Sequence, residues 1–486
     1  MQEHRLGKTK GMKRLLLGAS MLAFAVVASP ALAADATPEG AKQLQDQLAR
    51  YLTPQVFDSG VMTITPQGGA YALKVDMSPL SAMASAQGNS FSFEPYTYLI
   101  TPKSDGTYDV SSTSSFSMAA KGSEGEKAFD FKLAMTGCDA KGVFDPKLGS
   151  FTDMTSTCGK GEFVMHSPTE DVDASFGEIK STTTSVAADG GTTVTIASDI
   201  GGLTEAIDVK SPQPFKATLK AGSAKQEVVF AGARITNVLD LVAFLVQTGG
   251  PEKALAAQQD IKDKLLAALP IWTNLGGNVV FNDVEVETPI GTVKASSFTE
   301  AIGLSGATKD ASYTVGIKLA GLELPEGLVP AWAAPLVPKE GNIDIKFSGA
   351  DLDAMARLAI NNFDATKNPP LPPELQGQFM AMLLGGQPKV TLSPSKLTAD
   401  KVEVGASGEM SVFPSQAGKV VVTASNLDAV SEAITNSDMP NKEQALMGLT
   451  MVKGMGKAGA DGVTVWEVEF DVGSKKVLVN GQPLPM

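Results

Sequence analysis

The feature that most limits the fold of this chain is a long succession of short segments in which polar and apolar residues alternate. Such alternation is typical of β-strands with one face toward a core. Gly-Gly and Asp-Gly pairs interrupt the segments, and these pairs favour the tight turns of antiparallel hairpins. We therefore predict three hairpins, with turns at Gly68-Gly69, Asp105-Gly106 and Asp189-Gly190, over residues 59–77, 96–118 and 181–199.

Several of these strands carry serine or threonine at most positions, as in residues 111–117 and 181–185. Strands of this composition bury little apolar surface on either face. An antiparallel sheet tolerates a solvent-exposed face, whereas parallel sheets are covered on both faces. The composition therefore predicts an antiparallel sheet with part of its surface in water.

From about residue 215 the chain alternates strand patterns with helix patterns. Residues 228–247, 343–363 and 420–436 share one order: a β-branched strand, small residues, a polar residue able to cap, then an amphipathic helix. The predicted capping residues are Thr236 or Asn237, Asp351 and Asn426. We interpret the three segments as a degenerate internal repeat of strand–helix units.

The N-terminal segment has the three-part layout of a secretory signal peptide. Two basic residues precede an apolar run over residues 15–27, and small residues follow it. We predict a signal peptide at 1–33, cleaved between Ala33 and Ala34, with Met12 as an alternative start. The apolar run is shorter than the ~20 residues of a membrane-spanning helix, and no cysteine follows it to carry a lipid. We expect a periplasmic protein that is not an integral membrane protein.

The acidity of the chain limits its partners. Removing residues 1–33 takes away five basic residues and one acidic residue, which leaves 35 basic and 52 acidic residues and a formal net charge of −17. Such a surface repels phosphate backbones and anionic head groups. We expect no nucleic-acid partner, and no feature of the sequence indicates an oligomeric state.

These patterns together predict an α+β fold dominated by β-structure. We expect one or more elongated or curved antiparallel sheets with amphipathic helices packed on one side. The processed chain, of about 450 residues, exceeds a typical single core, so two lobes are expected. We place an N-terminal β-rich lobe with a leading helix at residues 34–210 and a C-terminal α+β lobe at 211–486.

The two cysteines of the chain, Cys138 and Cys158, lie in a segment that reads as a strand, a turn and a returning strand. An even number of cysteines in an exported chain favours a disulfide. A redox pair is the alternative, but it would favour a C-x-x-C spacing. We predict a structural disulfide between Cys138 and Cys158.

Gly454, Gly456 and Gly459 have the G-x-G-x-x-G spacing of a dinucleotide site. In such a site a strand leads into the glycines and a helix leaves them. Here a helical pattern precedes the glycines and a strand pattern follows. We therefore interpret Gly456 or Gly459 as a helix C-cap in a left-handed conformation, and we expect no cofactor.

The helix before these glycines carries Met447, Met451 and Met455 at intervals of four residues. Three interpretations are compatible with this spacing. The methionines could fill a core, form a deformable surface for an apolar partner, or offer thioethers to copper(I). We favour the first two and predict no metal site.

Catalysis has little support in the side chains available. His4 lies in the predicted signal peptide, so the processed chain has one histidine, His166. A serine triad would have to use it with Ser167 and a nearby Glu170, Asp171 or Asp173, and no G-x-S-x-G elbow presents a serine. We expect a surface histidine and a protein that is not an enzyme. A histidine-independent hydrolase with paired carboxylates is the alternative.

Residues 351–360, 426–434 and 465–485 carry a family resemblance. Together with the predicted signal peptide, they resemble the exported Gram-negative proteins grouped as domain of unknown function 2125. The closing hairpin with Asn480-Gly481 is also similar to the ends of the YdgA-like envelope proteins. The resemblance implies a periplasmic β-rich protein and assigns no functional residues.

We predict a non-enzymatic envelope protein that binds a lipid or another hydrophobic component of the envelope between sheet and helices. A purely structural or protein-interaction role is the alternative, in which the apolar helix faces only seal a core. The residues predicted to form the hydrophobic surface lie on three helices: Met355, Leu358, Met380, Leu383, Met447, Met451 and Met455.

Overall fold

The computed structural model describes residues 36–85, 89–124, 127–188, 190–413 and 416–484. The predicted signal peptide, with Ala33 and Ala34, lies outside these ranges. Within them the chain forms one antiparallel sheet of 23 strands. The predicted β-dominated architecture with a large antiparallel sheet is confirmed.

The strands of the sheet are β1 (Met62–Gln67), β2 (Ala70–Val75), β3 (Ser90–Phe93), β4 (Tyr96–Pro102), β5 (Tyr108–Glu124), β6 (Lys127–Asp145), β7 (Ser150–Cys158), β8 (Gly161–His166), β9 (Glu170–Phe176), β10 (Ile179–Ala188), β11 (Gly191–Val209), β12 (Phe215–Ala233), β13 (Asn274–Thr288), β14 (Gly291–Ser305), β15 (Ala311–Ala320), β16 (Glu340–Ala350), β17 (Lys389–Thr398), β18 (Glu403–Ser411), β19 (Ala417–Ser425), β20 (Lys457–Ala458), β21 (Val463–Asp471), β22 (Lys476–Val479) and β23 (Gln482–Pro483). The α-helices are α2 (Pro38–Leu48), α3 (Pro54–Asp58), α4 (Ser78–Ser85), α5 (Ile235–Thr248), α6 (Pro251–Ala256), α7 (Gln258–Ala267), α8 (Leu352–Asn362), α9 (Leu375–Gly385), α10 (Leu427–Thr435) and α11 (Lys442–Met455).

The predicted hairpins are confirmed as β1–β2, β4–β5 and β10–β11. Gly68 and Gly106 take φ values of 60° and 87°, a left-handed conformation that glycine adopts at little cost. Asp105 supports its turn, because its Oδ1 accepts a hydrogen bond from the Thr107 N–H at 2.9 Å. Local turn chemistry therefore sets the registers of these strands.

The three strand–helix units are present as β12–α5, β16–α8 and β19–α10. Asp351 caps α8 as predicted, since its Oδ1 accepts a hydrogen bond from the Ala354 N–H at 2.9 Å. The prediction of Thr236 or Asn237 as the cap of α5 is wrong. That helix begins earlier, at Ile235, directly after the strand, and no side chain caps it.

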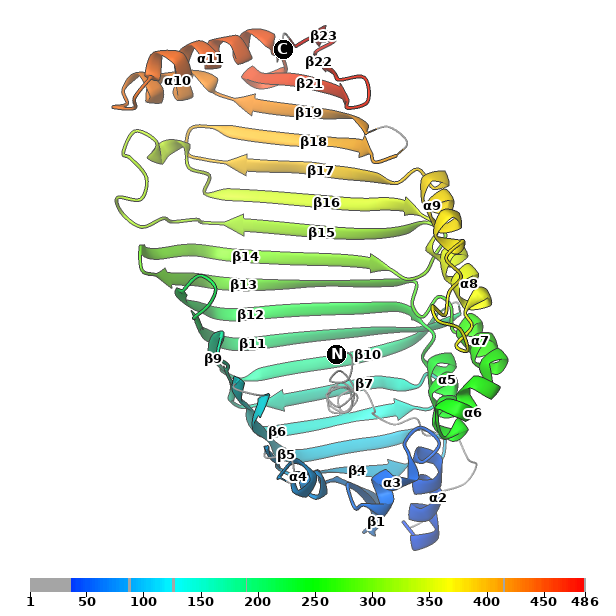
Figure 1. The fold of residues 1–486 in the computed structure, drawn as a ribbon. Helices are drawn as coiled ribbons and strands as arrows, with labels where there is room; N and C mark the ends of the chain where they lie inside the picture. The colour runs from blue at the N-terminus through cyan, green and yellow to red at the C-terminus, as the bar shows by residue number, and fades with distance from the viewer. Residues whose placement is uncertain (1–35, 86–88, 125–126, 189, 414–415, 485–486) are drawn as a thin grey trace.

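The sheet is a nearly continuous meander (Figure 1). From β9 onward, most strands pair with the next strand in the chain. There are two exceptions. Strands β9 and β10 both pair with one edge of β11, and β19 pairs with β21, with α10, α11 and β20 between them in the sequence. Nearer the N-terminus, β7 and β8 share one edge of β6, and β3 and β4 share one edge of β5. Long strands therefore carry two short partners end to end, which keeps the sheet unbroken.

The sheet bends where these short strands meet. Gly137 in β6 and Gly202 in β11 have φ values of 57° and 53°, and the β5–β6 register shifts next to Gly137. An extra residue at such a position turns the strand and increases its twist. β8 and β9, which pair beyond these glycines, are seen nearly edge-on in Figure 1.

The two faces of the sheet differ in character. Residues directly opposite one another on antiparallel strands share a face, so a row of paired residues traces one face across the sheet. We call inner the face that carries this row: Ile100, Val110, Gly142, Met154, Thr183, Ile196, Val228, Gly277, Ile302, Val315, Ile345, Leu392, Gly408, Val420, Val468 and Val479.

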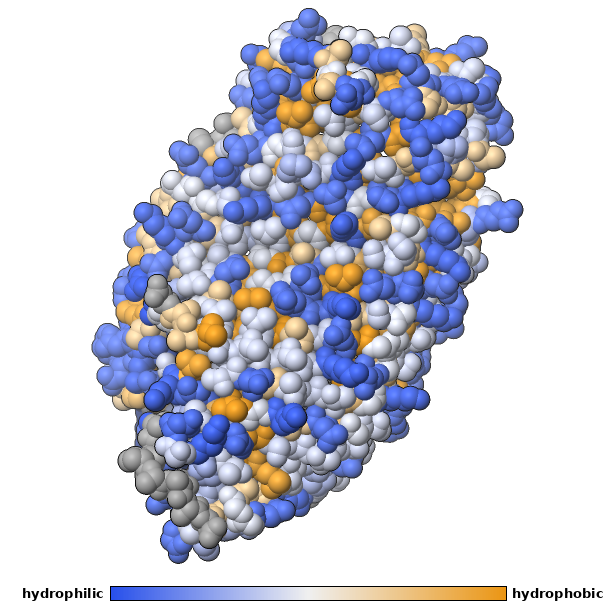
Figure 2. Space-filling view, turned by 180° about the vertical axis from the view of Figure 1, so that it is seen from behind, coloured by the Kyte–Doolittle hydropathy of each residue, from blue (hydrophilic) through white to orange (hydrophobic). Residues whose placement is uncertain are grey.

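The opposite, outer face is polar. Ion pairs cross its strands, as between Lys389 and Glu409 or between Lys419 and Glu467, each with 3.0 Å between Nζ and Oε2. Figure 2 views the molecule from behind Figure 1, and hydrophilic and intermediate residues cover most of that surface. This is the composition expected of a sheet face that remains in water.

Helices cover the inner face at its two ends. Leu44 and Leu48 of α2 and Phe57 of α3 form a buried cluster with strand residues that include Ile100 and Phe144. At the other end, Leu427 of α10 and Met455 of α11 pack against the cluster of Ala424, Trp466 and Val479. These two clusters are the buried cores that close the ends of the sheet.

The remaining long helices do not lie on the face of the sheet. Figure 1 shows α5 to α9 in a column along the ends of the strands, on one side of the molecule. They contact one another in order, and Lys264 Nζ of α7 lies 5.3 Å from the centre of the Phe244 ring of α5. The middle of the inner face is therefore left without a helical cover among the described residues.

The predicted boundary between lobes at residues 210 and 211 falls in the connection between β11 and β12. These two strands pair along almost their whole length, from Thr192 with Ala233 to Val209 with Phe215. Strand pairing thus continues across the boundary. The division into two lobes stays a prediction.

The predicted disulfide is confirmed: Cys138 and Cys158 are joined, with an S–S distance of 2.09 Å and a sequence separation of 20. It links β6 to β7 beside the bend at Gly137.

Replacing both cysteines by serine should lower the free energy of unfolding by about 3 kcal/mol, because a loop of this size is no longer closed in the unfolded chain. Urea denaturation measures the loss, and reduction of the wild-type protein should reproduce it. A difference below ~1 kcal/mol would show that the bridge constrains little.

Candidate functional site

The middle of the inner face exposes large apolar side chains to solvent. Eight of them on β14 to β18 have exposed fractions between 37 % and 47 %. We call this set the inner strip: Ile302, Leu304, Tyr313, Ile317, Ile343, Phe347, Leu397 and Val404. Its members come from sequence positions up to 102 residues apart, from Ile302 to Val404, and the sheet places them on one surface.

Strand registers show that the inner strip is continuous. Leu304 lies opposite Tyr313, which lies opposite Phe347, and Ile317 lies opposite Ile343. The Tyr313 and Phe347 rings are stacked, with 6.2 Å between their centres. A second stacked pair, Phe281 and Phe298, extends the apolar surface onto β13, with 6.5 Å between ring centres.

An exposed surface of this kind is unusual for an isolated soluble protein. Contiguous apolar patches above a few hundred Å² mark sites that bind ligands, membranes or other proteins. Burying a Leu, Ile or Phe side chain completely contributes about 1.5–3 kcal/mol, so covering a half-exposed one contributes roughly 1 kcal/mol. A ligand that covers the inner strip would gain this contribution from several side chains together.

The covered end of the inner face contrasts with the strip. Phe144 is 1 % exposed and packs edge-on against Phe151, with 5.5 Å between ring centres. Burial raises the pKa of Tyr96, on β4, to about 12, so its hydroxyl stays protonated. The inner face is therefore closed under α2 and α3 and open over β14 to β18.

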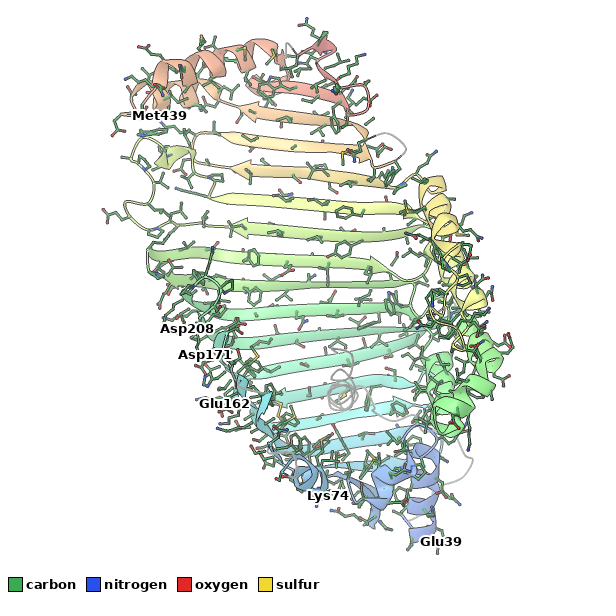
Figure 3. The ribbon with its side chains drawn as sticks, viewed as in Figure 1. Glu39, Lys74, Glu162, Asp171, Asp208 and Met439 are labelled. Carbon is green, nitrogen blue, oxygen red and sulfur yellow. A yellow bond between two sulfur atoms is a disulfide. The ribbon has the colours of Figure 1, made fainter. Side chains whose placement is uncertain are left out.

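Charged side chains gather at the margins of the sheet. Glu162, Asp171 and Asp208 lie along the left edge in Figure 3, and Lys74 and Glu39 lie at the bottom. Several are paired with lysines across the strands, as Asp171 is with Lys210 at 2.6 Å, and that hydrogen bond lowers the pKa of Asp171. The margins are thus hydrated, whereas the inner strip is apolar.

The residues predicted from helices do not form one surface. Met447 and Met451 on α11 are 69 % and 59 % exposed, and Met380 on α9 is also exposed. However, α11 lies at the opposite end of the strands from α8 and α9 (Figure 1). Met455 packs against the Trp466 cluster, while Met355, Leu358 and Leu383 are partly buried in the column of helices. The expectation that these helices together line one groove is wrong.

The inner strip was missed at the level of sequence because its residues come from strands. The signal was present in the alternation of β14 to β16, where Ile302 and Leu304, Tyr313 and Ile317, and Ile343 and Phe347 recur at even spacing. Such alternation predicts a face but does not say whether another element covers it.

The prediction of a left-handed C-cap at Gly456 or Gly459 is also wrong. Gly456 does occupy the C-cap of α11, but its φ is −77° and its ψ 154°, and Gly459 is extended as well. Close approach requires glycine at this site, because a Cβ on Gly456 would lie 2.1 Å from Thr464 Cγ2. The strand β21 therefore packs directly under the end of α11.

The candidate catalytic residues do not assemble a triad. His166 Nε2 lies 3.1 Å from Asp173 Oδ1 at an exposed position, while Ser167 donates its hydroxyl to the Glu170 carbonyl at 2.9 Å. No group of three or more potential metal ligands occurs within the described ranges. A hollow at the bend is lined by polar and apolar residues that include Lys220, Glu285 and Phe176. The hydrogen bond from Lys294 lowers the pKa of Glu285. A carboxyl held ionised in this way is a poor general acid.

No helix of the described chain combines the length and the apolar character needed to cross a membrane.

In comparisons with known proteins, no family model, no curated protein and no solved structure matches this chain. The resemblance to the domain of unknown function 2125 and to YdgA-like proteins therefore stays a prediction. The physical character of the inner strip carries the functional argument.

Proposed function

We propose that this protein is a non-enzymatic periplasmic envelope protein that binds a lipid or another hydrophobic envelope component on its inner strip. The observation that carries the proposal is the row of paired inner-face residues from Ile100 to Val479. Its two ends lie in buried clusters under helices, and its middle is open. An apolar surface bounded in this way suits an apolar ligand that completes the core.

Alkyl chains suit the chemistry of the inner strip better than ligands that need directed hydrogen bonds. The strip consists of aliphatic and aromatic side chains, and the backbone groups beneath them are paired within the sheet. The five spacings from β13 to β18, at about 4.8 Å each, give a surface roughly 24 Å across. One leaflet of a bilayer core is about 15 Å thick, so an extended acyl chain fits within that width.

Lipid retention tests the proposal. The full chain is purified from its native cells without detergent, the bound material is extracted with organic solvent, and lipids are identified by mass spectrometry. We expect lipid in near-stoichiometric amount. A protein that carries no lipid and also fails to bind a fluorescent apolar probe in solution would contradict the proposal, and a bound apolar polypeptide in its place would support the protein-interaction alternative.

A further inference from the structure

One acidic residue lies within the apolar part of the inner face. Glu300 is on β14, between Phe298 and Ile302 on the same face of its strand, and it lies opposite Val279 on β13 and Ile317 on β15. Its four nearest same-face neighbours are therefore apolar. The Glu300 side chain is exposed, and among the described residues it has no hydrogen-bond or ion-pair partner.

Glu300 differs from several other strand carboxylates, which are paired. On the outer face, Glu409 and Glu467 pair with lysines on adjacent strands, and Glu403 pairs with Lys396. No lysine or arginine occupies the two positions directly opposite Glu300. An unpaired carboxylate among apolar side chains contributes nothing to the packing of the sheet, which points to a role toward a ligand.

Polar side chains lead across the inner face to Glu300. Ser181 and Ser198 lie opposite one another, with 2.8 Å between their hydroxyl oxygens, and Ser198 lies opposite Gln226. Val279 separates Gln226 from Glu300 along the same row. Beyond Glu300 the row continues with Ile317 and Ile343. Glu300 thus lies between the inner strip and this polar row, with Val279 separating it from Gln226.

A ligand chain lying on the inner strip would remove water from the Glu300 carboxylate. Dehydrating a carboxylate without a partner is strongly unfavourable, whereas a charge-assisted hydrogen bond from an ammonium group compensates for the lost water. The formal charge of the chain, −13, favours the approach of a cation and opposes that of an anion. An amphiphile with a positive head and an alkyl tail satisfies both parts of the surface.

Building on the proposed lipid-binding function, we propose that Glu300 selects the ligand class, namely alkyl-chain amphiphiles whose head group carries an ammonium cation. The ammonium group pairs with the Glu300 carboxylate, at the edge of the inner strip. The alkyl chain extends from there over Ile317, Ile343 and the rest of the inner strip. Glu300 is in this account a specificity-determining residue of the site.

Competition between three amphiphiles of equal chain length tests this proposal. Dodecylamine, dodecanol and dodecanoate compete with a fluorescent apolar probe for the full chain. The amine and the acid are used below their micelle concentrations and the alcohol below its solubility limit. We expect dodecylamine to compete at least tenfold better than dodecanol, with dodecanoate the weakest. In the Glu300→Gln variant the advantage of dodecylamine over dodecanol should vanish, while displacement by dodecanol stays unchanged.

Glu227→Gln is the matched control, because it removes the same charge from an exposed position on the outer face of β12. This variant should keep the wild-type order. Glu300→Lys provides a second test, since it should reverse the order in favour of dodecanoate. Circular dichroism shows whether each variant is folded.

The outcomes separate this proposal from the one on which it rests. If dodecanol displaces the probe and dodecylamine does so no better, or if Glu300→Gln keeps the preference, the role of Glu300 is refuted and lipid binding stands. If the probe does not bind the wild-type protein at all, the lipid-binding function is itself refuted.

Discussion

Replacing Tyr313 by glutamate is expected to weaken binding of an apolar fluorescent probe by at least tenfold. Tyr313 lies in the inner strip, stacked on Phe347 and opposite Leu304. A carboxylate there would lose water beneath the bound ligand without gaining a partner, and a tenfold loss requires only about 1.4 kcal/mol. Probe titration followed by fluorescence measures the change in Kd.

Thr314→Glu is the control for this substitution. It adds the same charge one residue further along β15, where the side chain points to the outer face, opposite Lys346. The Kd of this variant should stay within about twofold of the wild-type value, which corresponds to ~0.4 kcal/mol. Equal loss of binding in both variants would show that charge or instability, and not the inner strip, governs the interaction.

The second large effect concerns stability and compares two phenylalanines on the same face. Phe144→Ala should lower the free energy of unfolding by about 3–5 kcal/mol, because the side chain is fully buried under the N-terminal helices and its removal leaves a cavity. Phe347→Ala should lower it by less than about 1.5 kcal/mol, since nearly half of that side chain already faces solvent. Urea denaturation of the ligand-free protein gives both values.

Added ligand makes this comparison sharper. A lipid bound to the inner strip should raise the stability of the wild-type and Phe144→Ala proteins by similar amounts, because binding to the folded state stabilises it. The gain should be smaller for Phe347→Ala, which lacks one contact. Equal losses of stability for the two variants without ligand would show that the strip is covered and belongs to the core.

Local features of this fold followed from the sequence because short-range chemistry determines them. Glycine at Gly68 and Gly106 makes tight turns inexpensive, Asp351 satisfies the first backbone donors of α8, and Cys138 and Cys158 lie on adjacent returning strands. Each of these outcomes depends on residues close together in the chain or on a single pair. The β-dominated fold class followed from the same local patterns.

The long-range arrangement could not be read from these patterns. The register shift beside Gly137 interrupts the alternation within β6, so a simple period of two assigns one half of that strand to the wrong face. The methionine spacing predicts a binding surface on helices, because exposed helical methionines are typical of such surfaces. In the structure the helices occupy strand ends and sheet ends, and the open apolar surface is made by strands.

Photocrosslinking from the inner strip tests the central claim most directly. A benzophenone amino acid replaces Phe347 in one variant. In another variant it replaces Thr314, on the outer face of the adjacent strand. Both variants are irradiated in native cells, purified, and analysed by mass spectrometry of the intact protein and of the lipids. We predict covalent lipid adducts at position 347 and none at position 314. Adducts of equal abundance at both positions, or none at position 347, would contradict the claim that lipid occupies the inner strip.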